Sequence, residues 1–336
     1  MNNSKLIRGL IAAMIGLVAI TAILQMQTKK LVVSDEIDQY LETLATLAPQ
    51  ITAVEVQSGE SVLRVEKSGD RWIVASRCGF SAKAEPIQEL VRGLIALETT
   101  QKMTAKPDRH HELGLAWPDE KKVARRVRVF IDGASDATTD IIVGNAVQSP
   151  TGVYLRKFGE NQAYRASGRL AAVADAGLWL DGPIAEFESK NIQQIDVDGL
   201  TLTQKDSQWN FVADAAPETK RDALKSTIPY LLSGFQPEDV RVASPDDLTH
   251  PNQVAAIFHL DAEHAVDARI WKESDGIWVR LAAGECSATP HELLDKYSAQ
   301  WNGWVFRLPT WRAGQFEPLF ADPTLAPPLA PKVISP

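Results

Sequence analysis

Two stretches of the chain begin as zinc-peptidase helices do, with a histidine followed by a glutamate. They are His111-Glu-Leu-Gly-Leu115 and His291-Glu-Leu-Leu-Asp295. A zinc ion held on one helical face needs a second imidazole four residues after the first. Leucine and aspartate stand at that place, so the motif is incomplete in both stretches. We expect no metal site here, and we expect His110 and His111 to lie on the surface of a loop.

Other residue types that carry catalysis lack the surroundings that catalysis needs. The sequence contains no G-x-S-x-G, G-x-x-x-x-G-K or G-x-G-x-x-G pattern, which are the patterns of a nucleophile elbow, a phosphate loop and a dinucleotide site. Asp196/Asp198 and Glu186/Glu188 are spaced two apart, so in a strand each pair would share one face, as a glycosidase could use. Solvent-exposed strands carry the same pattern. We therefore expect no catalytic residue and no cofactor.

The only two cysteines are Cys78 and Cys286, which fall in different halves of the chain. An exported compartment permits disulfides, and a bond between these two would close a long loop and so stabilise the fold. Two free thiols fit the sequence equally well, and both states stay open at this stage.

Aromatic residues gather in the C-terminal third of the chain. Large aromatic side chains fill cores, and they also anchor interfaces and sugar-binding faces. We expect most of them in the core. The candidates for a partner-docking surface, with a carbohydrate groove as the alternative, are Trp301, Trp304, Trp311 and Phe316.

Composition and charge exclude several classes of protein. The 336 residues are 45% hydrophobic and 23% charged, which is typical of globular proteins and excludes wholesale disorder. The net charge of −8 excludes a basic nucleic-acid footprint. The basic run 121–128 has five cations in eight positions, interleaved with valines. We expect a strand with its arginines facing solvent, and the alternative is a surface for an acidic partner.

The predicted strands and helices that position these residues occur in the same order in both halves of the chain. Residues 51–74 and 195–212 each read as strand, turn, alternating strand, polar turn and a third strand led by a tryptophan. Trp72 and Trp209 stand at the matching points. A helix follows in each half, with an apolar stripe after Pro86 in the first and after Pro217 in the second.

Further strands complete each half, which gives the order β-β-β-α-β-β-β. Alternation with one polar face indicates antiparallel sheets covered on one side by a helix. We therefore predict an α+β protein with two tandem, repeat-like domains that follow an N-terminal transmembrane helix. The predicted boundaries are a cytoplasmic tail 1–8, an anchor 9–26, a linker 27–50 with a short amphipathic helix, a first domain 51–168, a connector 169–191, a second domain 192–320 and a Pro-rich tail 321–336.

The membrane anchor is predicted from Gly9–Met26, an uncharged apolar run. Eighteen residues of helix span about 27 Å, enough for the hydrocarbon core of a bilayer. No pair of small residues follows that would mark a cleavage site, so we expect a retained single-pass anchor, with a cleaved leader as the alternative. Lys5 and Arg8 precede the run, which favours a cytoplasmic N-terminus. The bulk of the chain would then lie outside the inner membrane, in the periplasm or its equivalent.

Several short stretches resemble the family known as domain of unknown function 4340. They are the hairpin 63–74, the helix 86–97, the turn Leu113-Gly-Leu-Ala-Trp-Pro118, Ile142-Val-Gly-Asn145 and Gly152-Val-Tyr-Leu-Arg156. The resemblance covers the first half well and the second half more loosely. Ala116 departs from the pattern, because the family usually has an acidic residue there.

The resemblance implies an exported, single-pass protein that accompanies ABC transporters of the gliding-motility auxiliary type. The family has no assigned catalytic residues, so none is carried over. We therefore expect a membrane-anchored accessory or scaffold protein of an ABC-type transport system, which acts by binding and not by catalysis. Its expected partners are the membrane and a permease or auxiliary subunit, and nucleic acid is not expected. The alternatives are an envelope hydrolase and a glycan- or small-ligand-binding module.

Overall fold

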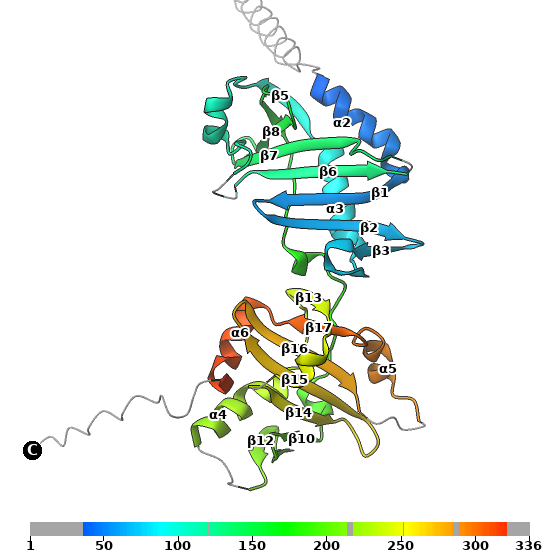
Figure 1. Ribbon diagram of the computed structural model, residues 1–336, viewed down its shortest axis with the longest axis vertical. Helices are drawn as coiled ribbons and strands as arrows, with labels where there is room; N and C mark the ends of the chain where they lie inside the picture. Colours follow the sequence, from blue (N-terminus) through cyan, green and yellow to red (C-terminus); the bar gives the residue numbers. More distant parts are fainter. Residues whose placement is uncertain are drawn as a thin grey trace, which may run out of the picture. The chain divides into compact units, whose positions relative to one another are not determined.

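The computed structural model describes residues 36–119, 121, 123–132, 134–213, 218–250, 252–284 and 289–320 (Figure 1). Among these residues no helix is both long and apolar enough to cross a membrane. The predicted anchor 9–26 and the Pro-rich tail 321–336 lie outside the described residues, and so does Cys286.

The chain divides into two compact units. Unit 1 contains the residues up to Ser76 together with Ala84–Ala174, and unit 2 contains Arg77–Lys83 together with the residues from Asp175 onward. The division after Ala174 falls within the segment 169–191 that we expected to connect two domains. The assignment of Arg77–Lys83 to unit 2 is not visible in the sequence.

Unit 1 is an antiparallel sheet with two helices. Eight of its strands are hydrogen-bonded in the order β3-β2-β1-β6-β7-β8-β9-β5. Strand β5 was not predicted, because its polar sequence ETTQK lacks apolar alternation. The elements are α2 (Glu36–Leu47), β1 (Ile51–Ser58), β2 (Ser61–Ser68), β3 (Arg71–Val74), α3 (Ala84–Ile95), β5 (Glu98–Lys102), β6 (Arg125–Ile131), β7 (Thr139–Val147), β8 (Gly152–Lys157) and β9 (Tyr164–Ser167).

The core of unit 1 follows from the period of two in its strands. Val54 lies opposite Val65 on one neighbouring strand and opposite Val129 on the other, and all three are at most 1% exposed. Helix α3 crosses the sheet (Figure 1) and buries one apolar stripe, Ile87, Leu90 and Leu94. Helix α2 does the same with Ile37, Leu41 and Leu44.

Unit 2 repeats the topology of unit 1 strand for strand. Its sheet has the order β12-β11-β10-β14-β15-β16-β17-β13, so β10 corresponds to β1, β12 to β3 and β17 to β9. The predicted α+β class with two antiparallel sheets is therefore confirmed. The elements are β10 (Gln194–Val197), β11 (Leu200–Lys205), β12 (Gln208–Phe211), α4 (Glu218–Thr227), β13 (Asp239–Val242), β14 (Val254–His259), β15 (Ala265–Glu273), β16 (Gly276–Ala283), α5 (Glu292–Ser298), β17 (Trp304–Arg307) and α6 (Thr310–Phe316).

The segment Arg77–Lys83, which includes β4 (Phe80–Ser81), is an integral part of unit 2. Phe80 is 4% exposed, and its ring meets those of Trp304 and Phe306 edge-on at centroid distances of 5.2 and 5.7 Å. Arg77 forms an ion pair with Asp239 of β13. Unit 2 therefore needs seven residues that lie between two strands of the first half in sequence.

Two of the three arginines of the basic run form ion pairs along the sheet of unit 1. Arg126 contacts Asp140 of β7 at 2.6 Å, and Arg128 pairs with Glu55 of β1, which is only 6% exposed. Arg126 also lies over the ring of Phe158 at 3.4 Å from its centroid. These two arginines of the run are thus partly buried by neighbouring strands and are not free cations on a solvated face.

Candidate functional site

Three stretches that resemble the family meet at one end of unit 1. The 3-10 helix η3 (Pro107–Leu113) ends at Gly114, whose φ is +68°. A Cβ on Gly144 would lie 2.3 Å from the carbonyl oxygen of Leu113, and one on Gly114 would lie 2.7 Å from Oδ1 of Asn145. The turn after η3 therefore packs directly on β7, at a distance that only glycine allows.

A buried arginine fixes this turn to β8. Arg156 is 8% exposed, and its Nε donates to the carbonyl oxygen of Leu115 at 3.2 Å, while its Nη1 donates to that of Glu160 at 3.1 Å. Burial lowers the pKa of the guanidinium from its ordinary value. Since its donors are bonded to backbone carbonyls, Arg156 positions the turn and is not itself a ligand-binding group.

Asp119 organises the chain that leads from the turn into β6. Its carboxylate accepts backbone N–H groups from Lys121 at 3.0 Å, Val123 at 2.6 Å and Ala124 at 2.7 Å. Burial acts to raise the pKa of Asp119, but these hydrogen bonds outweigh it and hold the pKa below its ordinary value. The ionised carboxylate thus fixes the start of β6.

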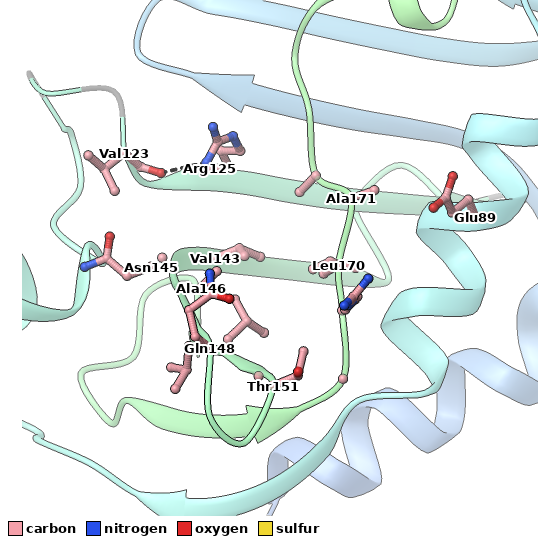
Figure 2. A pocket seen from close by; sticks show the side chains of 17 residues that line it. Glu89, Val123, Arg125, Val143, Asn145, Ala146, Gln148, Thr151, Leu170 and Ala171 are labelled. Carbon is pink, nitrogen blue, oxygen red and sulfur yellow. Dashed lines mark hydrogen bonds between the residues drawn. The ribbon is translucent and has the colours of Figure 1, made fainter.

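A groove of about 560 Å³ opens beside this assembly. Figure 2 shows the segment of Leu170 and Ala171 crossing in front of β6 and β7, with Asn145, Ala146 and Gln148 on one side and Glu89 of α3 on the other. A smaller hollow of about 290 Å³ shares the lining residues Val123 and Asn145 with the groove. Two of the family-like stretches, 142–145 and 152–156, therefore line the groove, and the third, the turn 113–118, lines the adjoining hollow.

One wall of the groove is an open strand edge. Strand β6 begins at Arg125, which lies opposite Val143 of β7. On that side no ladder pairing of the described chain continues past Val143. On its other side, the register between β7 and β8 shifts between Val143 and Ala146, which is a bulge. Asn145 and Ala146 are exposed although they belong to β7, and on the β6 side they have no partner strand in the described chain.

The polar side chains of the groove carry both signs of charge. Arg125 and Arg169 are the cations and Glu89 is the anion, and Asn145, Gln148 and Thr151 are uncharged. Arg125 donates to the carbonyl oxygen of Val123 at 3.0 Å. A surface that combines small residues, a free backbone edge and mixed polar groups suits the binding of an extended polypeptide.

The histidines of the two His-Glu stretches have structural roles. His110 is 4% exposed, with Nε2 at 2.8 Å from the carbonyl oxygen of Asn161, so the prediction that it lies on a loop surface was wrong. The carbonyl of Asn161 pairs with one of its two ring nitrogens and so holds the ring inside the fold. His111 is exposed as expected. In the second stretch, His291 caps helix α5, and its Nδ1 accepts the N–H of Leu294.

The carboxylates singled out from the sequence do not converge on one site in the described residues. Asp196 contacts Nε2 of His259 at 2.7 Å and accepts the hydroxyl of Thr201 at 2.8 Å, on the half-exposed face of β10. Asp198 lies in the turn after β10 with a φ of +48°. Across the described ranges no three His, Cys, Asp or Glu side chains are grouped as a metal ion would require.

The proposed aromatic partner surface divides into core and surface residues. Trp301 and Phe316 are each 1% exposed, and the indole of Trp301 donates to the carbonyl oxygen of Ile184 at 2.7 Å. The prediction that these two form a docking surface was therefore wrong. Trp304 is half-buried against Phe80, whereas Trp311 is 75% exposed. Only Trp311 of the four is freely available to a partner.

Cys78 is exposed, has a φ of +54° and forms no disulfide with any residue that the structure describes. Its expected partner in a disulfide, Cys286, lies outside the described residues. The disulfide between them stays a prediction.

Comparison with protein families assigns the chain. The family model described as Domain of unknown function (DUF4340) matches residues 72–252, which is more than half of the 336 residues. The chain belongs to the DUF4340 family. The DUF4340 match begins in β3 and extends into unit 2, and it includes every stretch that lines the groove. No curated protein and no solved structure gives a further match.

Proposed function

We propose that this DUF4340 protein is a membrane-anchored, extracytoplasmic accessory or scaffold protein of an ABC-type transport system, and that it acts by binding. The groove of unit 1 is its partner-binding surface. The observation that carries the proposal is the edge of β7 at Asn145 and Ala146, which has no partner strand past Val143 in the described chain and borders a groove lined by two family-like stretches, with the third beside it.

The chemistry of the groove favours a polypeptide partner. An added strand gains main-chain hydrogen bonds from the free edge, and adjacent side chains provide selectivity. The rigid attachment of the turn through Gly144 and Arg156 fixes the groove before a partner arrives, which lowers the entropy that binding must overcome. Anchoring is supported by the uncharged run Gly9–Met26. The ABC transporter context is supported by the family resemblance.

The proposal is tested by affinity purification of the tagged full-length protein from membranes in mild detergent, followed by mass spectrometry. We expect a permease or auxiliary subunit of an ABC transporter in near-stoichiometric amount. Ala146→Arg places a long charged side chain at the open edge and should abolish this recovery. Lys205→Arg, at an exposed strand end of unit 2, is the matched control and should leave it unchanged. Recovery of the bait alone from wild-type membranes would contradict the proposal.

A further inference from the structure

A second groove of unit 1 lies between the β2–β3 hairpin and helix α3, away from the residues of the first. Its volume is about 460 Å³. Its wall is apolar and includes Trp72, Ile87, Val91 and Ile95, and Lys67 and Arg92 also line it. Both cations are exposed, and Lys67 Nζ lies 5.4 Å from the centroid of the Trp72 ring.

The charges of this groove have one sign. Lys67 and Arg92 are its two ionised residues, and none of the described residues that line it is an acid. Nε of Arg92 donates to the carbonyl oxygen of Gln88 in its own helix at 3.2 Å, which leaves the other guanidinium donors for a ligand. An apolar wall with two cations is complementary to a molecule that has an apolar body and an anionic head.

Comparison with the corresponding strand of unit 2 shows that the tryptophan of this groove lacks a covering segment of the chain. Trp72 is the second residue of β3, and Trp209 is the second residue of the corresponding strand β12. Trp209 is 3% exposed, and its indole N–H donates to Oγ of Ser189 at 2.8 Å. Ser189 begins the 3-10 helix η5 (Ser189–Asn191), which precedes β10. In unit 2, the chain itself thus covers the tryptophan and satisfies its N–H group.

The corresponding position in unit 1 provides no such acceptor. The 3-10 helix η1 (Ala48–Gln50) precedes β1 and begins with Ala48, which lines the groove but has no hydroxyl. Trp72 is half-buried, whereas Trp209 is almost fully covered. The pairing also differs, because Lys67 lies opposite Trp72 where Gln204 lies opposite Trp209. In unit 1, therefore, the chain itself does not cover this tryptophan. The indole instead borders an open apolar groove and has a cation beside it.

We propose that this groove binds a long-chain carboxylate of the fatty-acid class. The alkyl chain packs on Trp72, Val91 and Ile95, and the carboxylate accepts hydrogen bonds from Lys67 and Arg92, which are the strong charge-assisted kind. A volume of about 460 Å³ lies within the usual range of small-molecule sites. This inference does not depend on the partner-binding role of the first groove.

Photolabelling of the full-length protein tests the proposal. A palmitate that carries a diazirine in its chain is added to protein in phosphatidylcholine nanodiscs and irradiated, and the adducts are mapped by mass spectrometry. We expect adducts within 67–72 and 87–95. The double variant Lys67→Glu, Arg92→Glu should lower them about tenfold or more, because it removes both charge-assisted hydrogen bonds to the carboxylate.

Two controls make the outcome decisive. Lys205→Glu reverses an exposed cation of unit 2 and should leave labelling unchanged, and all variants should share the thermal unfolding midpoint of the wild type. Unlabelled palmitate should compete with the probe, and hexadecanol, which has the same chain without the charge, should not. Adducts confined to other segments, equal labelling of the double variant, or equal competition by hexadecanol would each overturn the proposal.

Discussion

Gly144 of β7 lies so close to Leu113 that a Cβ on the glycine would be 2.3 Å from the leucine carbonyl oxygen. This contact places the turn after η3 directly on the bulged strand. The turn and the bulge together border the open edge of the groove. The shape of the proposed binding surface therefore depends on a close backbone contact between two residues that are 31 positions apart in the sequence.

Gly144→Ala should destabilise the protein by about 1–3 kcal/mol, the usual cost of an overpacked site. The neighbouring atom is backbone and cannot move aside as a flexible side chain would. Urea unfolding measures the difference. Gly314→Ala is the matched control, because its Cβ would meet nothing within 4 Å in an exposed part of α6. It should be neutral or stabilise by up to about 1 kcal/mol. Equal effects of the two substitutions would contradict the contact.

Asp119 should make the start of β6 sensitive to acid. Its pKa is held below the ordinary value of 3.8 in the folded protein, so the carboxylate stabilises the folded state at neutral pH. That contribution is lost as the pH falls below about 3.8 and through the folded-state value. Asp119→Asn should speed hydrogen exchange of the Val123 and Ala124 amides at pH 6, with a smaller difference from wild type near pH 3. Unchanged protection at pH 6 would show that the carboxylate does not hold these amides.

His264 should give unit 2 the opposite pH dependence. Its Nε2 lies 2.8 Å from the carbonyl oxygen of Thr289, and its Nδ1 lies 2.8 Å from the carboxylate of Asp261. Both partners only accept hydrogen bonds, so the doubly protonated ring fits best. The bond to Thr289, followed by that to Asp261, raises the pKa of His264 above its ordinary 6.5.

A raised folded-state pKa means that this stabilisation is complete below about pH 6.5 and is lost as the pH rises through the folded value. The urea midpoint of the wild type should therefore fall between pH 6 and pH 9 by more than that of His264→Gln. Glu263 and His291 also face the ring, so His291→Gln is included to separate their contribution. Parallel pH profiles of the wild type and His264→Gln would refute the prediction.

Trp301 and Trp311 should respond very differently to truncation. Trp301→Ala removes a side chain that is 1% exposed and a hydrogen bond to Ile184, and it should cost about 3–5 kcal/mol of stability. Trp311→Ala changes a side chain that is 75% exposed, and its effect should stay within about 0.5 kcal/mol. Chemical denaturation of both variants measures this. A large loss for Trp311→Ala would mean that its indole packs in the fold.

Much of the architecture could be predicted because it depends on local periodicity. The hairpin before Trp72, its counterpart before Trp209 and the helix that starts near Pro86 follow from alternation and helical spacing, and the structure has all of them. Strand β5 was missed because an edge strand needs little apolar alternation. The inclusion of Arg77–Lys83 in unit 2 could not be predicted, since it depends on Phe80 packing between aromatic rings more than 200 residues away.

The site was predicted less well than the fold. Gly114, Gly144 and Gly152 all lie in family-like stretches, but the contact of the Gly114 turn with β7 and the groove lined by Gly144 and Gly152 are tertiary features that sequence spacing does not encode. The burial of His110 was not predicted, because two adjacent histidines give no sequence signal that one of them is buried. The exposure of Trp72, in contrast to Trp209, became visible only when the two units could be compared strand by strand.

The most direct test of the partner-binding groove is site-specific photo-crosslinking in living cells. The photoreactive residue benzoylphenylalanine replaces Ala146 at the open edge of the full-length protein, and it replaces Lys205 in a control strain. We predict one strong adduct from position 146, with a permease or auxiliary subunit of an ABC transporter, and none from position 205. No adduct at position 146, or the same adducts at both positions, would contradict the account.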